Sequence, residues 1–156
     1  VAAIEATLAD VRDPREPRVA ALDPRMLKLL FRAAYHFGAA EVEVVSAYRK
    51  PGRYREGLHA HGRAIDFRLV GPSAKELAEF LRAQPRAGVG QYIHPRTQYV
   101  HLDVRDDSYH WLDGTPPGRA GGAWRIPEFG LPALDASWTP EHDLPENVLP
   151  RDVGDG

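Results

Sequence analysis

Apolar residues that recur at helical spacing predict a helix that begins near residue 24. Asp23 is expected to cap it, and Pro24 suits the first helical position, where no backbone N–H is needed. Gly38 is expected to end the helix, because glycine accepts the left-handed backbone of a helix C-terminus. The apolar residues between these signals recur at helical spacing: Met26, Leu29, Leu30, Ala33 and Ala34.

Period-two alternation predicts strands further along the chain. These expected strands span residues 41–48, 64–69, 89–93 and 98–104. Ser73 and Glu76 form a capping-box pattern, which predicts a second helix that ends near Gln84. We therefore expect an α+β fold in which a small central antiparallel sheet, paired mainly as hairpins, carries helices packed on one side.

The pattern changes after Asp113. Residues 114–156 contain half of the 14 prolines and half of the 14 glycines, and they show no sustained periodicity. We expect a Pro/Gly-rich C-terminal tail that packs on the domain with few regular elements. The predicted organisation is an N-terminal arm over residues 1–22, a domain over 23–112 and the tail over 113–156.

Composition narrows the chemistry. Apolar residues make up 43% and charged residues 27%, as in ordinary globular domains, and the net charge of −2 gives no basic field for nucleic acid. No apolar run approaches the roughly 18 residues that suggest a membrane span. The absence of cysteine excludes disulfides, thiolate metal sites and a cysteine nucleophile. Any metal must be held by His, Asp or Glu, and seven histidines are available.

Two predicted strands carry chemically capable side chains. Tyr99, His101 and Asp103 share one face of the strand over residues 98–104, opposite an apolar face. Asp66 lies in the strand over residues 64–69.

Two histidines precede Asp66 in a polar loop. His59 and His61 both lie a few residues before Asp66, so either could join Asp66 and His101 in one site. Two imidazoles and one carboxylate suit zinc and leave the fourth ligand position to water. The spacing alone leaves open which loop histidine is the ligand. It also leaves open whether these side chains form ordinary structural ion pairs.

A resemblance to a known family bears on these alternatives. Residues 59–66 form His-x(2)-Gly-x-Ala-x-Asp, residues 101–103 form His-x-Asp, and Ser-Ala-Tyr-Arg stands at residues 46–49. This order resembles the hedgehog/D-Ala-D-Ala zinc metallopeptidase group, which is peptidase family M15-like. The resemblance covers about residues 25–112. It implies that His59, Asp66 and His101 bind Zn²⁺, since only His59 stands seven residues before Asp66.

Within that group the chain most resembles the murein endopeptidase K branch. Gly-Val-Gly-Gln-Tyr at residues 88–92 matches a segment before the third ligand, and Trp111 matches a tryptophan after it. The resemblance implies hydrolysis of peptidoglycan stem peptides that contain D-amino acids, by a zinc-activated water. It leaves open whether the mode is endopeptidase or carboxypeptidase. We expect a periplasmic or secreted monomer, although this chain shows no export signal.

The resemblance also assigns further roles. Arg49 is expected to bind a substrate carboxylate or to stabilise the oxyanion, because a guanidinium matches carboxylate geometry. Tyr48 is expected beside it in the substrate site. A solvated charge at the end of a strand is the alternative for Arg49.

The chain departs from the family pattern at two positions. Gly57 replaces a common serine, and Gln98 replaces the glutamate that serves several members as general base. Asp103 is therefore our candidate base; its alternative role is to orient a ligand histidine by accepting its free N–H. His94 and His110 are lesser candidates, expected to be exposed loop residues.

Two rival functions follow from these departures. A non-catalytic relative could keep the zinc site without turning over peptides, and Gln98 favours that alternative. A binding module on a phage or secretion particle could use the proline-rich tail for docking. Peptidoglycan turnover with and without a chelator separates the first rival from an enzyme.

Overall fold

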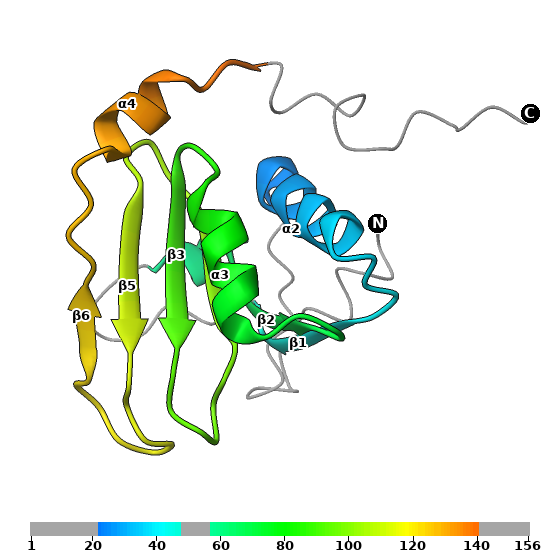
Figure 1. Cartoon of the computed structure of the whole chain (residues 1–156), viewed down its shortest axis with the longest axis vertical. Helices are drawn as coiled ribbons and strands as arrows, with labels where there is room; N and C mark the ends of the chain where they lie inside the picture. The colour runs from blue at the N-terminus through cyan, green and yellow to red at the C-terminus, as the bar shows by residue number, and fades with distance from the viewer. Residues whose placement is uncertain (1–21, 48–56, 141–156) are drawn as a thin grey trace, which may run out of the picture.

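A computed structural model of the chain describes residues 22–47 and 57–140 and confirms the α+β class (Figure 1). In this part of the chain, one six-stranded sheet has the strand order β1-β2-β4-β3-β5-β6. The elements are α2 (Pro24–His36), β1 (Val42–Ser46), the 3₁₀ helix η1 (Leu58–His61), β2 (Ala64–Leu69), α3 (Ala74–Arg82), β3 (Ala87–Tyr92), β4 (Val100–Val104), β5 (Tyr109–Asp113), β6 (Ala123–Arg125) and α4 (Leu131–Ala136).

The helix boundaries follow the signals in the sequence. The Asp23 side chain accepts a hydrogen bond from the backbone N–H of Arg25 at 2.9 Å, which caps α2. Gly38 follows the last turn of α2 with φ 60°, the left-handed conformation expected there. Ser73 and Glu76 form both hydrogen bonds of the capping box at the start of α3.

The sheet combines predicted and unpredicted pairings. Strands β3 and β4 form the expected antiparallel hairpin, and β2 pairs antiparallel with both β1 and β4. Strand β5, by contrast, pairs parallel with β3, and β6 extends the edge beyond it. The sequence did not indicate β5, because its residues Tyr-His-Trp-Leu-Asp do not alternate between apolar and polar. The sheet therefore continues past Asp113.

One face of the sheet carries the hydrophobic core. Helices α2 and α3 cover this face in Figure 1, and their apolar stripes pack on alternate strand residues. The largest fully buried apolar side chains of this core are Phe67, Met26, Ile65, Leu77, Leu81 and Leu102. Each such side chain contributes roughly 1.5–3 kcal/mol on burial, so this face supplies most of the driving force for folding.

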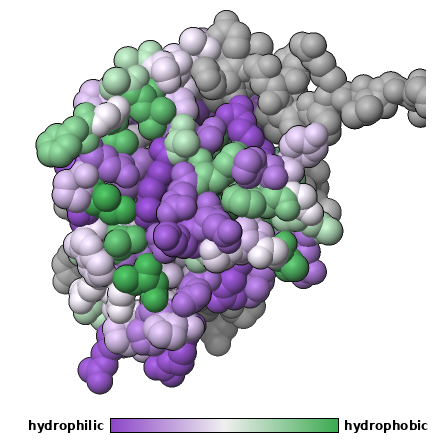
Figure 2. All heavy atoms as spheres, in the orientation of Figure 1, coloured by the Kyte–Doolittle hydropathy of each residue, from purple (hydrophilic) through white to green (hydrophobic). Residues whose placement is uncertain are grey.

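The outer surface on the helix side is mixed. Figure 2 shows hydrophobic and hydrophilic side chains interspersed over this face of the molecule. None of the helices in the two described ranges combines the length and the apolar character needed to cross a membrane.

Candidate metal centre

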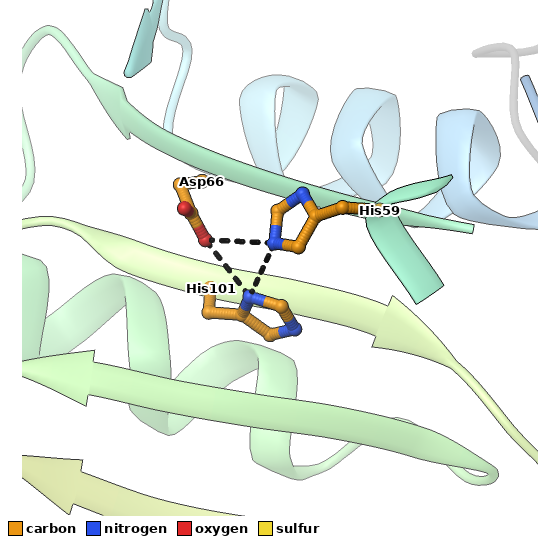
Figure 3. Close-up of side chains that lie close together, drawn as sticks. All are labelled: His59, Asp66 and His101. Atoms are coloured by element: carbon orange, nitrogen blue, oxygen red, sulfur yellow. Dashed lines mark hydrogen bonds and ion pairs between the residues drawn. The ribbon is translucent and has the colours of Figure 1, made fainter. Parts of the chain in front are cut away.

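Three of the predicted ligands converge on the sheet face opposite the helices (Figure 3). Asp66 on β2 and His101 on β4 are direct cross-strand partners, so their side chains leave the sheet side by side. The distance from Asp66 Oδ1 to His101 Nδ1 is 2.8 Å. His59 Nε2 lies 3.2 Å from His101 Nδ1 and 3.5 Å from Asp66 Oδ1. The three atoms form a small triangle with one ligand atom from each residue.

The short 3₁₀ helix η1 places His59 beside Asp66 and His101. Gly62 ends η1 with φ 67°, and its N–H points back to the carbonyl oxygens of Leu58 and His59. This left-handed conformation favours glycine and reverses the chain into β2. His61 lies on the same turn but is exposed, and the cluster does not include it. The structure thus brings His59, and not His61, to Asp66 and His101.

The second nitrogen of each clustered histidine is occupied by an acceptor. His59 Nδ1 lies 2.6 Å from the carbonyl oxygen of Ala47, and His101 Nε2 lies 2.9 Å from Asp103 Oδ2. A carbonyl or carboxylate oxygen can only accept, so these nitrogens carry the protons. In the neutral rings, the lone pairs are then on His59 Nε2 and His101 Nδ1, the two nitrogens that face Asp66.

This donor set fits a metal cation. Two neutral imidazole nitrogens and one carboxylate oxygen lie within 4.8 Å of one another. Outer hydrogen bonds that fix the tautomer and orientation of each ligand histidine are typical of metal sites. The residues present could therefore hold one metal ion.

Burial and hydrogen bonding shift the pKa values of Asp66 and His101 in opposite directions. In the absence of a metal ion, burial alone would raise the pKa of Asp66, but the facing nitrogens of His101 and His59, when protonated, donate hydrogen bonds that outweigh burial and lower it. Burial alone would lower the pKa of His101, yet its hydrogen bonds to Asp103 and Asp66 raise it. Both carboxylates are fully buried. The site therefore holds ionised carboxylates that depend on cationic neighbours.

Asp103 is held by Arg105 as well as by His101. Its Oδ1 accepts from Arg105 Nε at 2.6 Å, and its Oδ2 accepts from Arg105 Nη2 and from His101. Burial alone would raise the pKa of Asp103, but these hydrogen bonds lower it. A paired carboxylate of low basicity is suited to orienting His101, the second of its two predicted roles. Its role as general base stays a prediction.

Two glycines of β3 make room for this arrangement. Gly88 lies opposite Asp103 and Gly90 lies opposite His101 across the β3–β4 pair. A Cβ on Gly88 would come within 2.3 Å of Asp103 Oδ2, and one on Gly90 within 2.3 Å of the Trp111 ring. The Trp111 ring centroid lies 5.0 Å from that of His101. The Gly-Val-Gly segment thus has a steric role: it lets Asp103 and Trp111 lie beside His101.

Other predicted residues have different outcomes. Arg49 and Tyr48 lie outside the described residues. The expectation that His110 is an exposed loop residue was wrong: it is fully buried in β5, and its Nδ1 contacts Glu128. The error follows from the missed strand. His94 lies in the turn between β3 and β4, where its Nδ1 accepts the Arg96 N–H at 3.2 Å.

Gln98 lies away from the metal-ligand cluster. Its side chain is exposed, and it lines a small cavity of about 50 Å³ with the core residues Phe67 and Leu77. These neighbours belong to the helix-covered face, whereas Asp66 and His101 leave the sheet on the other.

Sequence reasoning missed Arg105 and Ala47. Arg105 continues the alternation of Tyr99, His101 and Asp103 by one step, so the period-two pattern could have placed it on the same face. Ala47 contributes a backbone carbonyl, for which its side chain gives no sequence signal.

Comparisons with known proteins agree with the resemblance. The sequence model of a family described as peptidoglycan L,D-endopeptidase MepK, Peptidase_M15_2, matches residues 2–111. A probable peptidoglycan L,D-endopeptidase MepK of Haemophilus influenzae is 31% identical over 110 residues, which are 60% of this chain and 56% of that protein. Peptidoglycan L,D-endopeptidase MepK of Escherichia coli K12 is 27% identical over 112 residues, 64% of this chain and 60% of that protein.

The chain therefore spans less than two thirds of the length of these curated relatives. No solved structure matches the chain.

Proposed function

The chain belongs to the family described as peptidoglycan L,D-endopeptidase MepK, and on this premise we propose that it is a zinc-dependent peptidase. The proposed substrates are peptidoglycan stem peptides or cross-links that contain D-amino acids. The convergence of His59 Nε2, Asp66 Oδ1 and His101 Nδ1 carries the proposal. An endopeptidase mode is favoured because the family and its relatives are named for that activity.

Zinc is the proposed metal because of the ligand atoms. Two imidazole nitrogens and one carboxylate oxygen, with an open fourth position, are a common donor set of catalytic zinc sites. Calcium and magnesium prefer oxygen ligands, which fits this site less well. When bound, zinc supplies Lewis-acid chemistry: it polarises a carbonyl oxygen and lowers the pKa of water to about 7.

The protein contributes a fixed arrangement around that chemistry. The Ala47 carbonyl holds His59 in the tautomer whose Nε2 is free to coordinate. Asp103, itself held by Arg105, does the same for His101. Asp66 brings the negative charge that a divalent cation requires. Because each ligand is oriented by hydrogen bonds, little conformational entropy remains to be lost when the metal binds.

Substrate contacts are proposed from the sequence motif. Arg49 and Tyr48 follow β1, the strand that pairs with β2. We assign Arg49 to a substrate carboxylate or to the developing oxyanion, with Tyr48 as a neighbouring substrate contact. Asp103 is assigned to orienting His101, and proton transfer by Asp103 is the alternative.

The substrate also fixes the proposed setting. Peptidoglycan lies outside the cytoplasm, so the protein would act in the periplasm or outside the cell. The proposed working unit is a monomer, because all three metal ligands come from one chain.

A turnover assay tests this function. Purified protein loaded with one equivalent of zinc is incubated with cross-linked peptidoglycan fragments, and products are identified by liquid chromatography and mass spectrometry. We expect cleavage of a peptide bond, loss of cleavage with a chelator and recovery with zinc. A protein that binds zinc stoichiometrically and binds the fragments but cleaves none would instead be a non-catalytic cell-wall-binding relative.

A further inference from the structure

A second feature lies beside the metal centre on the same face of the sheet. A cavity of about 270 Å³ is lined by Arg105, Tyr109, Trp111, Ala123, Trp124 and Arg125. Two of these residues also touch the metal centre. Arg105 holds Asp103, and the Trp111 ring lies against His101. The cavity therefore shares two of its lining residues with the surroundings of His101.

The strand register shows how the cavity is aligned with the metal ligands. Direct cross-strand pairs connect His101 to Gly90, Gly90 to Trp111 and Trp111 to Arg125. Directly paired residues project from the same face of a sheet. Neighbouring strands lie about 4.8 Å apart, so three steps place the Arg125 backbone roughly 14 Å from that of His101. An extended peptide of about four residues spans this distance.

The charges in the cavity do not balance. Arg105 is paired with Asp103, so these two side chains neutralise each other. Among the residues that the structure describes, no carboxylate lies within ion-pair distance of Arg125. The Arg125 guanidinium lies 5.0 Å from the Tyr109 ring centroid, and the Arg105 guanidinium lies 5.6 Å from the same ring. Two cations thus share one aromatic ring, and of these two only Arg105 has an anionic partner among residues 22–47 and 57–140.

Aromatic side chains give this site a defined shape. Tyr109 is 37% exposed and Trp124 is 50% exposed, so both rings are accessible to a ligand in the cavity. Tyr109 and Trp111 lie with ring centroids 5.8 Å apart. A guanidinium placed over an aromatic ring is oriented and partly desolvated, and this strengthens its hydrogen bonds to a carboxylate.

We infer that this cavity is a carboxylate-binding subsite for the substrate peptide. Arg125 binds a carboxylate that lies about four extended residues from the bond held at the metal centre, while Tyr109 and Trp111 contact the adjoining apolar part of the peptide. The inference rests on the proposed function, because it places the rest of a substrate cleaved at His59, Asp66 and His101. Strand β6, which supplies Arg125, lies beyond the residues 2–111 matched by the family.

A pair of substrates tests the subsite. One is a cross-linked peptidoglycan fragment with free carboxylates, and the other is the same fragment with its carboxylates converted to primary carboxamides. Equilibrium binding to the chelator-treated full chain is followed by tryptophan fluorescence, which does not depend on turnover. Binding is compared among the native chain, Arg125→Ala, Arg125→Lys and the control Arg119→Ala, which removes an exposed arginine outside the cavity.

We expect Arg125→Ala to weaken binding of the free-acid fragment by about 10- to 100-fold, as expected for the loss of hydrogen bonds to a charged group. Arg125→Lys should restore part of this loss, because the charge remains without the bidentate fork. Arg119→Ala should bind like the native chain. Circular dichroism should show each variant folded, since both arginines are exposed.

Two results would overturn the subsite: equal binding of both fragments by the native chain, or unchanged binding by Arg125→Ala. The outcomes separate the subsite from the proposed function. Arg125-dependent binding without any cleavage by the zinc-loaded chain would support the subsite and contradict the peptidase. Cleavage of both fragments with the same KM, in the native chain and in Arg125→Ala, would support the peptidase and contradict the subsite.

Discussion

The two faces of the central sheet are both buried at the metal centre, but they are buried for different reasons. On the helix-covered face, Ile65, Phe67 and Leu102 pack against α2 and α3 and are at most 1% exposed. On the other face, Asp66 and Asp103 are equally inaccessible, yet they are surrounded by imidazole and guanidinium groups. Neighbouring residues on one strand thus belong to opposite environments.

The difference between the faces shows which of them stabilises the fold. Burial of apolar side chains is favourable by roughly 1.5–3 kcal/mol each. Burial of ionised groups is costly, and a buried ion pair is often no better for stability than apolar residues of the same size. A buried network such as Asp66, His101, Asp103 and Arg105 is therefore better explained by what it can bind than by what it contributes to folding.

Asp66→Asn is expected to have the largest effect on function and little effect on the fold. The amide keeps the shape but removes the negative charge between two imidazoles, so stoichiometric zinc should be lost. Loss of several kcal/mol of transition-state stabilisation corresponds to a fall in turnover of at least about 10³-fold. Metal analysis checks the loss of zinc, and circular dichroism checks that the fold is retained. Full zinc content in this variant would remove Asp66 from the ligand set.

Phe67→Ala, at the next position on β2, should show the opposite behaviour. Phe67 is fully buried against the helices, so its truncation should lower the free energy of unfolding by about 3–5 kcal/mol. The folded fraction should still bind one zinc per chain. Denaturant unfolding and metal analysis of the folded protein measure these two quantities. Loss of zinc without loss of stability would show that the two faces are not separable.

Asp103→Asn distinguishes the two roles of this residue. If Asp103 orients His101, zinc affinity should fall by about 10- to 100-fold, and high zinc should restore activity. If Asp103 moves a proton, kcat should fall by about 10²–10⁴-fold at every zinc concentration. The paired geometry of Asp103 favours the first result. Activity measured across a zinc titration decides between them.

Gly90→Ala should have a smaller effect, through packing beside the metal centre. The added methyl would lie 2.3 Å from the Trp111 ring, so the ring must move away from His101. We expect a loss of about 1–3 kcal/mol of stability, which is typical of overpacking. Gly130→Ala is the matched control, because its Cβ would meet nothing within 4 Å and its φ is −86°. Equal stability of the two variants would contradict the steric role of Gly90.

The sequence predicted the helix-covered face well because local signals determine it. The caps at Asp23 and Ser73 place the helices, and strict alternation over residues 64–69 and 100–104 places β2 and β4. Strand β5 escaped prediction because its pattern is mixed and its parallel partner β3 is distant in sequence. The position of His110 was wrong for the same reason.

The site was predictable in part. The alternation around His101 and the two histidines that precede Asp66 suggested a metal centre, but only the family resemblance distinguished His59 from His61. In the structure, the His59 ring is held toward β2 and β4 by the carbonyl oxygen of Ala47, whereas His61 is exposed. The subsite at Arg125 could not be predicted, because it depends on the register of two strands that the sequence pattern did not reveal.

The most direct test of the metal centre is the zinc content of two matched variants, His59→Ala and His61→Ala. The two histidines lie on the same short helix, so both substitutions change the local backbone and charge in similar ways. After loading with zinc and removal of excess metal, His61→Ala should retain one zinc per chain and His59→Ala should retain almost none. Full zinc content in His59→Ala, together with its loss in His61→Ala, would contradict the proposed ligand set.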